Sequence, residues 1–272
     1  RTSASCIEPA DFDDDGDLDL FVGGRIKPAQ YPLPPRSYVL QNEKGKFQDV
    51  TEILNPSLAE PGMISSAVWA DYNNDRRIDL VVAGEWQPIR VFENRGQTFA
   101  EVTDATGLKN SNGWWNCIQA ADLNKDGYPD FVVGNAGKNS FFKPTTEHPV
   151  QIVAKDFDNN GSIDPLITYY NPVEKERFIV HNRLVLIDQI PGIKRRFETF
   201  TEYATRPFEK VFTEEEMSGA FIASAYQLAS VILVNDRGAG FTMKNLPDIA
   251  QMSTVNDILV DDVNHDGSSD IV

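Results

Sequence analysis

The chain contains 272 residues, of which 41 are acidic and 25 basic, so its formal net charge is −16. This excess of acid argues against a nucleic-acid-binding protein, whose affinity depends on basic surface. Hydrophobic residues make up 41% of the sequence, enough for a buried core, and no run approaches the roughly 18 apolar residues of a membrane span. Cys6 and Cys117 are too few for a disulfide scaffold, and we expect both to be buried free thiols.

An apolar run at residues 3–10 is followed by an acidic segment whose nine-residue pattern recurs along the chain. Acids occupy positions 1 and 9, oxygen-bearing side chains occupy positions 3 and 5, and Gly usually occupies position 6. The five copies lie at residues 11–19, 71–79, 122–130, 156–164 and 262–270. A β-branched or aromatic run follows most copies, so each is predicted to be a loop between two strands.

Three later segments combine an apolar run, an Asn, a Gly-bearing turn and a Phe, at residues 38–47, 90–99 and 230–241. Asn and Gly adopt positive φ at low cost, so each segment is predicted to be a β-hairpin. One unit is then strand, acidic loop, strand and hairpin. We assign the third hairpin to the unit opened by Asp156, and we expect the unit opened by Asp122 to lack a full fourth strand.

The long gap before the fifth loop indicates an insertion over residues 183–218. Ile187, Ile190, Ile193 and Phe197 recur there at three- and four-residue steps, which is helical periodicity. The acids at 214–216 after Thr213 are typical of a helix start. We interpret the charged clusters of this segment as solvated helix faces.

Tandem four-stranded units of this length predict an all-β fold, a β-propeller. We expect a single partial propeller domain over residues 1–272, with about four complete units, part of a fifth, and the helical insertion of residues 183–218 within the fourth. Because the sequence stops inside the fifth unit, the predicted domain is a fragment of a longer ring.

The acidic loops carry the predicted chemistry. Alternating oxygen ligands, a sharp Gly bend and a backbone carbonyl at position 7 suit Ca²⁺, whereas Mg²⁺ prefers to keep several waters. Ordinary Asp-, Asn- and Gly-rich turns are the alternative, but five copies flanked by strands favour metal binding. The candidate ligands are Asp11, Asp13, Asp15, Asp17 and Asp19; Asp71, Asn73, Asp75, Arg77 and Asp79; Asp122, Asn124, Asp126, Tyr128 and Asp130; Asp156, Asp158, Asn160, Ser162 and Asp164; and Asp262, Asn264, Asp266, Ser268 and Asp270.

The five loops are not equivalent. The first has acids at positions 1, 3, 5 and 9, so we expect it to bind Ca²⁺ most tightly. The loop that begins at Asp71 has Arg76 where Gly is expected, which adds backbone strain and positive charge. We expect that loop to bind weakly or not at all.

The chain resembles the FG-GAP/VCBS-repeat β-propellers with integrin-type calcium loops. The likeness is strongest to bacterial cartilage-acidic-protein-like, ASPIC/UnbV-associated surface proteins. It rests on the five loops, the helical insertion, and the segments 80–86, 113–116 and 155–165. The resemblance implies structural calcium, a full ring of seven blades and an exported protein, often lipid-anchored, at the bacterial cell surface, in the periplasm or outside the cell.

Five aromatic residues could stack on a sugar ring, although such residues also pack between propeller blades. They are Trp86, Trp114, Trp115, Tyr169 and Tyr170. We find no nucleophile elbow, phosphate-binding Gly loop or catalytic triad signature. The favoured hypothesis is a non-enzymatic calcium-binding surface propeller that binds a glycan or protein. The alternatives are a propeller-type polysaccharide lyase or dehydratase, and a structural protein-interaction module.

Overall fold

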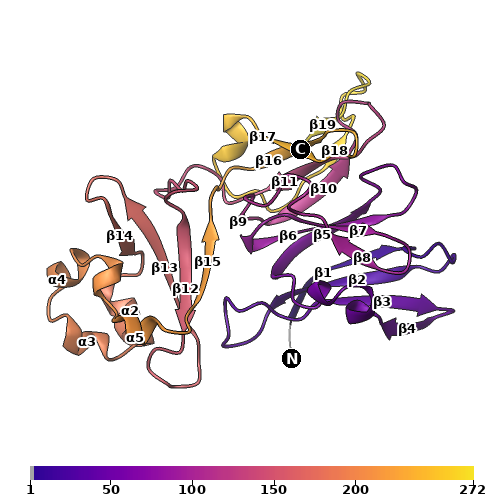
Figure 1. Cartoon of the computed structure of the whole chain (residues 1–272). Coiled ribbons are helices and arrows are strands. Elements are labelled where there is room, and N and C mark those ends of the chain that lie inside the picture. The colour runs from indigo at the N-terminus through magenta and orange to yellow at the C-terminus, as the bar shows by residue number, and fades with distance from the viewer. Residues whose placement is uncertain (1–2) are drawn as a thin grey trace.

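The computed structural model describes residues 3–272, which form an all-β, propeller-like array of antiparallel sheets (Figure 1). The first sheet has the simple order β1-β2-β3-β4. Its strands are β1 Ser3–Ala10, β2 Asp19–Ile26, β3 Tyr38–Glu43 and β4 Lys46–Asp49. The first acidic loop joins β1 to β2, and the hairpin predicted at 38–47 forms β3 and β4, so this unit follows the predicted plan.

The second sheet repeats that plan in the order β5-β6-β7-β8. The short helices α1 Thr51–Leu54 and η1 Pro56–Leu58 lead into it from β4. The strands are β5 Met63–Ala70, β6 Asp79–Gln87, β7 Arg90–Asn94 and β8 Phe99–Glu101. A further short strand, β9 Gly113–Trp114, pairs with the end of β6. The loop that begins at Asp71 therefore joins β5 to β6.

The third sheet corrects two predictions. Its order is β10-β11-β16-β17, with strands β10 Cys117–Ala121, β11 Asp130–Gly134, β16 Val231–Asn235 and β17 Phe241–Asn245. The hairpin at 230–241 therefore completes the unit opened by Asp122, and its assignment to the unit opened by Asp156 was wrong. The expectation that the Asp122 unit lacks a full fourth strand was also wrong, because the hairpin supplies its third and fourth strands. Phe131 of β11 pairs with Leu233 of β16. The hairpin joins the free edge of β11 although the two are far apart in the sequence, so proximity along the chain does not decide which sheet it joins.

The segment between β11 and β16 forms a separate lobe, here called the inserted lobe (residues 135–230). Its sheet has the order β14-β13-β12-β15, and the Asp156 loop joins β12 to β13. The strands are β12 Val150–Lys155, β13 Asp164–Asn171, β14 Glu176–Ile179 and β15 Phe221–Ala225. Figure 1 shows this lobe beside the three stacked sheets, with its helices on the far side of its own sheet.

The helices of the inserted lobe lie between β14 and β15, within the range 183–218. They are α2 Arg183–Gln189, α3 Ile193–Arg196, α4 Phe200–Ala204, η2 Phe208–Lys210 and α5 Glu214–Met217. Thr213 and Glu216 form a reciprocal capping box that starts α5. Hydrogen bonds from Arg196 hold the pKa of Glu216 down at about 2. The apolar helix faces and β12–β13 then share one core, which includes Leu186, Ile193 and Phe197.

The three stacked sheets are held together by cores between neighbouring units. β5 lies against both β1 and β10, which places these first strands side by side. Phe21, Leu80 and Phe92 are fully buried in the core shared by the first two sheets. Val81, Trp115 and Phe131 are fully buried in the core shared by the second and third. Cys6 and Cys117 are free thiols at equivalent positions, half-buried and buried respectively.

One Asn in each hairpin connects the hairpin to the acidic loops. The side-chain amide of Asn94 donates to the carbonyl of Ile78 in its own unit (3.2 Å) and to that of Phe12 in the preceding unit (2.7 Å). Asn235 repeats this arrangement with Pro129 (2.9 Å) and Tyr72 (2.8 Å). The loops are thereby fastened from one unit to the next.

The chain ends with η3 Asp248–Gln251 and a two-stranded sheet of β18 Val260–Asp261 and β19 Asp270–Ile271, joined by the fifth acidic loop. Within residues 3–272, no helix is long and apolar enough to cross a membrane.

Candidate metal-binding loops

All five acidic loops share one backbone conformation. The carboxylate at position 1 accepts hydrogen bonds from the N–H groups of positions 5 and 6, at 2.8 to 3.1 Å in every copy. Positions 4 and 6 both have positive φ, as at Asp14 (62°) and Gly16 (93°). These bonds fold each loop around the first carboxylate, so the predicted ligand positions lie on one short turn.

The side chain at position 5 accepts the N–H of position 7 in every loop. The donors are Asp17, Arg77, Tyr128, Ser162 and Ser268, at 2.8 to 3.1 Å. This bond orders the residues whose carbonyls are the predicted position-7 ligands. In the loops that begin at Asp71, Asp122, Asp156 and Asp262, the position-3 side chain also accepts the N–H of position 5.

The acids at position 9 are more deeply placed than the other predicted ligands. Asp19, Asp79 and Asp130 are buried, and each accepts one N–H from position 2 of its loop and one from the hairpin Asn. Burial raises the pKa of all three, that of Asp79 to about 7. These two hydrogen bonds connect the loop to the hairpin. Each carboxylate oxygen keeps a second lone pair, so these acids can also bind a cation.

The last two loops are simpler at position 9. Asp164 is buried and accepts the N–H of Phe157 at 2.9 Å, and burial raises its pKa. Asp270, only partly buried, accepts the N–H of Val263 at 3.1 Å. Neither is bonded to a hairpin Asn among the hydrogen bonds of residues 3–272.

Two loops bring three carboxylates to one place. The groups are Asp11, Asp13 and Asp15, and Asp156, Asp158 and Asp164, with ligand oxygens within 4.8 Å of one another in each group. In the remaining three loops Asn stands at position 3. The first group also has an unsatisfied atom, because Asp13 Oδ1 is buried without a hydrogen-bond partner. A hard cation would satisfy that oxygen and balance the three charges, so this loop fits a Ca²⁺ ion.

The loop that begins at Asp71 contains its own cation. The Arg77 guanidinium pairs with Asp75 Oδ2 at 2.5 Å and donates through Nε to the carbonyl of Asn94 at 2.8 Å. Arg76 holds the positive-φ position with φ of 73°. Sequence reasoning identified Arg76 as the unfavourable residue but placed Arg77 only as a carbonyl ligand; the ion pair is visible only in the structure.

Replacing Arg76 with Gly should stabilise this loop by up to about 1 kcal/mol, because a non-Gly residue in the left-handed region is strained. Chemical denaturation of both proteins without metal measures the change. Gly127→Arg, at the same position of the third unit, should destabilise by a similar amount. If both substitutions changed the free energy of unfolding in the same direction, the proposal that a non-Gly residue strains position 6 would be contradicted.

The loops of neighbouring units also contact one another. Asn74 donates its side-chain amide to the carbonyl of Gly127 at 3.0 Å, and Lys125 reaches the carbonyl of Gly267. These contacts run from position 4 of one loop to position 6 of the next. The second, third and fifth acidic loops therefore form a continuous row along one end of the sheets.

The five aromatic candidates are divided among three places. Trp115 is fully buried and donates its indole N–H to the carbonyl of Ser111, so it is a core residue. Trp86 and Trp114 contact each other with ring centroids 4.7 Å apart, between the second sheet and the inserted lobe. Tyr170 stacks on His148 at 3.7 Å. Tyr169 packs against the same hydrophobic cluster as Trp86 and Trp114, and it also lines a pocket in the lobe.

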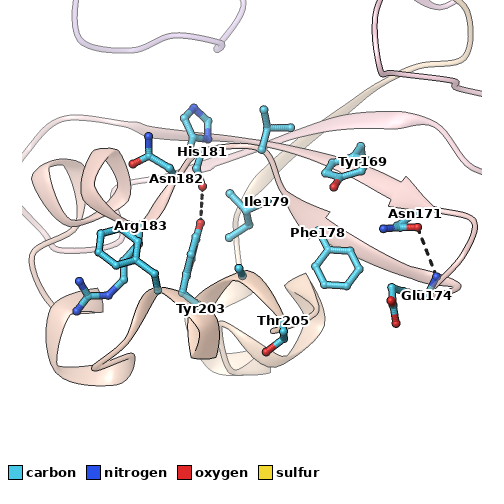
Figure 2. Close-up of a pocket in the computed structure, with 13 residues that line it drawn as sticks. Tyr169, Asn171, Glu174, Phe178, Ile179, His181, Asn182, Arg183, Tyr203 and Thr205 are labelled. Carbon is cyan, nitrogen blue, oxygen red and sulfur yellow. Dashed lines mark hydrogen bonds between the residues drawn. The ribbon is translucent and has the colours of Figure 1, made fainter.

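That pocket, of about 460 Å³, lies between the β13–β14 hairpin and α4 (Figure 2). The Tyr203 hydroxyl donates to the backbone carbonyl of His181 at 2.7 Å, and the buried Arg183 guanidinium donates to the carbonyl of Phe197. Burial raises the pKa of Tyr203 to about 12 and lowers that of His181. A tyrosine that acts as a base needs a lowered pKa, and the pKa of Tyr203 is shifted in the opposite direction.

Comparison with known proteins finds a similar repeat in the first half of the chain. Residues 11–82 and 71–133 match the model of the FG-GAP-like repeat, so the first two units and the start of the third are similar to this repeat. A solved structure of an Agrocybe aegerita lectin, described as recognising non-reducing terminal N-acetylglucosamine, is 16% identical in sequence. The alignment covers 99% of this chain and 74% of the lectin chain, with a TM-score of 0.31. No curated protein matches the sequence.

Proposed function

We propose that this chain is a non-enzymatic calcium-binding propeller segment that presents a binding face to a glycan or protein ligand. In this proposal, Ca²⁺ in the acidic loops fastens the first strand of each unit to the second. The observation that carries it is the first loop. Three carboxylates converge there, they form no salt bridge within residues 3–272, and Asp13 Oδ1 is buried without a hydrogen-bond partner in that part of the chain.

The loops supply what a calcium site needs. Asp11, Asp13 and Asp15 would hold the ion in the first unit, and Asp156, Asp158 and Asp164 would hold one in the inserted lobe. Calcium would neutralise the clustered charges and cross-link the loop, which is a structural role. Calcium modules of extracellular proteins are adapted to the high calcium concentrations outside cells. We therefore propose that the protein is exported, to the cell surface, the periplasm or the outside of the cell.

Thermal unfolding with calcium and with a chelator tests the proposal. Because Ca²⁺ binds the folded loops and not the unfolded chain, one site at 100 times its Kd adds about 2.7 kcal/mol. For a chain of this length that is roughly 5 to 10 °C in Tm. Magnesium at equal concentration should shift Tm much less, because it dehydrates reluctantly. Equal melting temperatures in calcium and chelator would overturn the proposal.

An enzymatic alternative, a polysaccharide lyase or dehydratase, would require a convergent Tyr, His or basic group with a favourably shifted pKa. The lobe pocket collects such residues, but its Tyr and Arg are held by backbone carbonyls. Turnover of an acidic polysaccharide that is lost in Tyr203→Phe would favour this alternative. Absence of both turnover and glycan binding would favour a structural protein-interaction module.

A further inference from the structure

A second pocket lies where the second sheet meets the inserted lobe. Its volume is about 350 Å³, and its walls include Trp86, Gln87 and Arg90 from the second sheet and Ser224 and Tyr226 from the lobe. β15 packs against β6 here, and Tyr226 donates its N–H to the carbonyl of Asn112 at 2.8 Å. The pocket is therefore built by two parts of the fold that hydrogen bonds hold in place.

Gln87 is the unusual residue of this pocket. The residue is 5% exposed, yet neither Nε2 nor Oε1 of its side chain has a hydrogen-bond partner among residues 3–272. A Cβ atom at Gly62 would lie 1.7 Å from Oε1, and one at Gly84 would lie 2.1 Å from Nε2. Two glycines thus make the space in which the amide sits. Buried amides are almost always satisfied, so an unpaired one that lines a pocket points to a ligand.

Two neighbouring features of the same wall support this interpretation. Arg90 donates a hydrogen bond from Nη1 to Glu101 Oε1 at 2.8 Å. Its Nε is buried and has no hydrogen-bond partner among residues 3–272. Trp86 has φ of 63°, a conformation that is rare for a bulky side chain and that collects at functional sites. The wall of the pocket therefore contains two donor atoms and one acceptor atom that have no partner among residues 3–272, at a constrained strand end.

The charges around the pocket are already paired. Glu85 forms a salt bridge with Arg25 and accepts a hydrogen bond from the Tyr31 hydroxyl. The Oε1 atom of Glu60 lies 3.6 Å from Nζ of Lys27. An anionic ligand would meet these acids, and an apolar ligand would leave the Gln87 amide unpaired. Hydroxyl groups both donate and accept, so a neutral polyhydroxyl ligand matches the unused atoms.

We propose that this pocket binds a neutral sugar residue, with Gln87 as its main hydrogen-bonding side chain and Arg90 Nε as a second donor. The proposal rests on the function proposed above and names where the glycan would bind. The volume is at the small end of ligand sites, which favours one or two sugar residues over a peptide segment. Trp86 is 4% exposed and gives its indole N–H to Tyr31, so it forms a wall and not a stacking platform.

Saturation-transfer NMR with free glucose, galactose, mannose and N-acetylglucosamine, in calcium buffer, tests the site. At least one sugar should show transfer that Gln87→Leu weakens at least about tenfold. Because that substitution removes an unsatisfied buried amide, the variant should melt no lower than wild type, so lost binding would not reflect unfolding. Gln189→Leu, on α2 away from the pocket, should bind as wild type does.

The outcomes separate this proposal from the calcium proposal. Calcium-dependent melting without transfer to any of the four sugars would overturn the sugar site alone. Transfer that persists in Gln87→Leu would place the sugar elsewhere and also overturn it. Binding of glucuronic acid in preference to all neutral sugars would contradict the charge argument. Sugar binding that depends on Gln87 in a protein with no calcium response would support the site and overturn the calcium proposal.

Discussion

The Asp13→Asn variant is expected to be as stable as wild type, or more stable, in chelator, and less stable in calcium. Without metal, Asp13 adds one of three carboxylates whose oxygens lie within 4.8 Å of one another. An amide in its place removes repulsion, and its oxygen can still accept the 2.6 Å hydrogen bond from Gln41. In calcium the same change removes a charged ligand, so the sign of the effect reverses.

The expected size follows from binding linkage. Removing even an outer partner of a metal ligand costs 10- to 100-fold in affinity, so loss of a direct ligand should cost about 100-fold or more. At a calcium concentration of about 1,000 times the wild-type Kd, that loss removes roughly 2.7 kcal/mol of stabilisation. Denaturant unfolding in calcium and in chelator measures both signs, and calorimetric titration should show one tight site fewer.

The matched control is Asn73→Ala, at the same position of the loop that Arg77 already neutralises. We expect it to change the calcium response little, whereas Asp13→Ala should change it strongly. Equal losses in the two alanine variants would contradict the ranking of the loops. A destabilised Asp13→Asn protein in chelator would show that repulsion among the carboxylates is not significant.

Local sequence patterns were enough to predict the loops and most strands. The five acidic loops all join paired strands, and the hairpins at 38–47 and 90–99 form as predicted. The pairing of β16 with β11 could not be predicted in this way, because their residues are about one hundred positions apart and the lobe between them has its own sheet. Local periodicity defines a strand, but which free edge it joins is decided by the packed fold.

The candidate sites likewise have features that follow from local sequence and features that depend on packing. The ligand types of the loops follow from their spacing, and the resemblance to FG-GAP repeats agrees with the matched segments 11–82 and 71–133. The unpaired Asp13 Oδ1, the Arg77–Asp75 ion pair and the buried Gln87 amide depend on side chains brought together by packing. An isolated Gln or Arg gives no signal in a single sequence, so these features appear only in three dimensions.

The Asn235→Ala variant is expected to lose about 3 kcal/mol of stability. The Asn235 side chain is buried and makes three hydrogen bonds: it donates to the carbonyls of Tyr72 and Pro129 and accepts the N–H of Gly238. Removing it leaves those backbone groups unsatisfied inside the protein, at about 1 kcal/mol or more each. Asn94→Ala should cost a similar amount, because Asn94 makes the equivalent bonds between the first two units.

Asn42→Ala is the control, because Asn42 holds the same hairpin position in the first unit but bonds only within that unit, to Leu18 and Gly45. We expect it to cost about 1 kcal/mol or less, since its partners are exposed to water. Chemical denaturation in chelator compares the three variants without a contribution from metal. The difference between the stability losses of Asn235→Ala and Asn42→Ala then measures the hydrogen bond from Asn235 to Tyr72, which joins the third unit to the second. Equal losses would mean that this bond does not couple the two units.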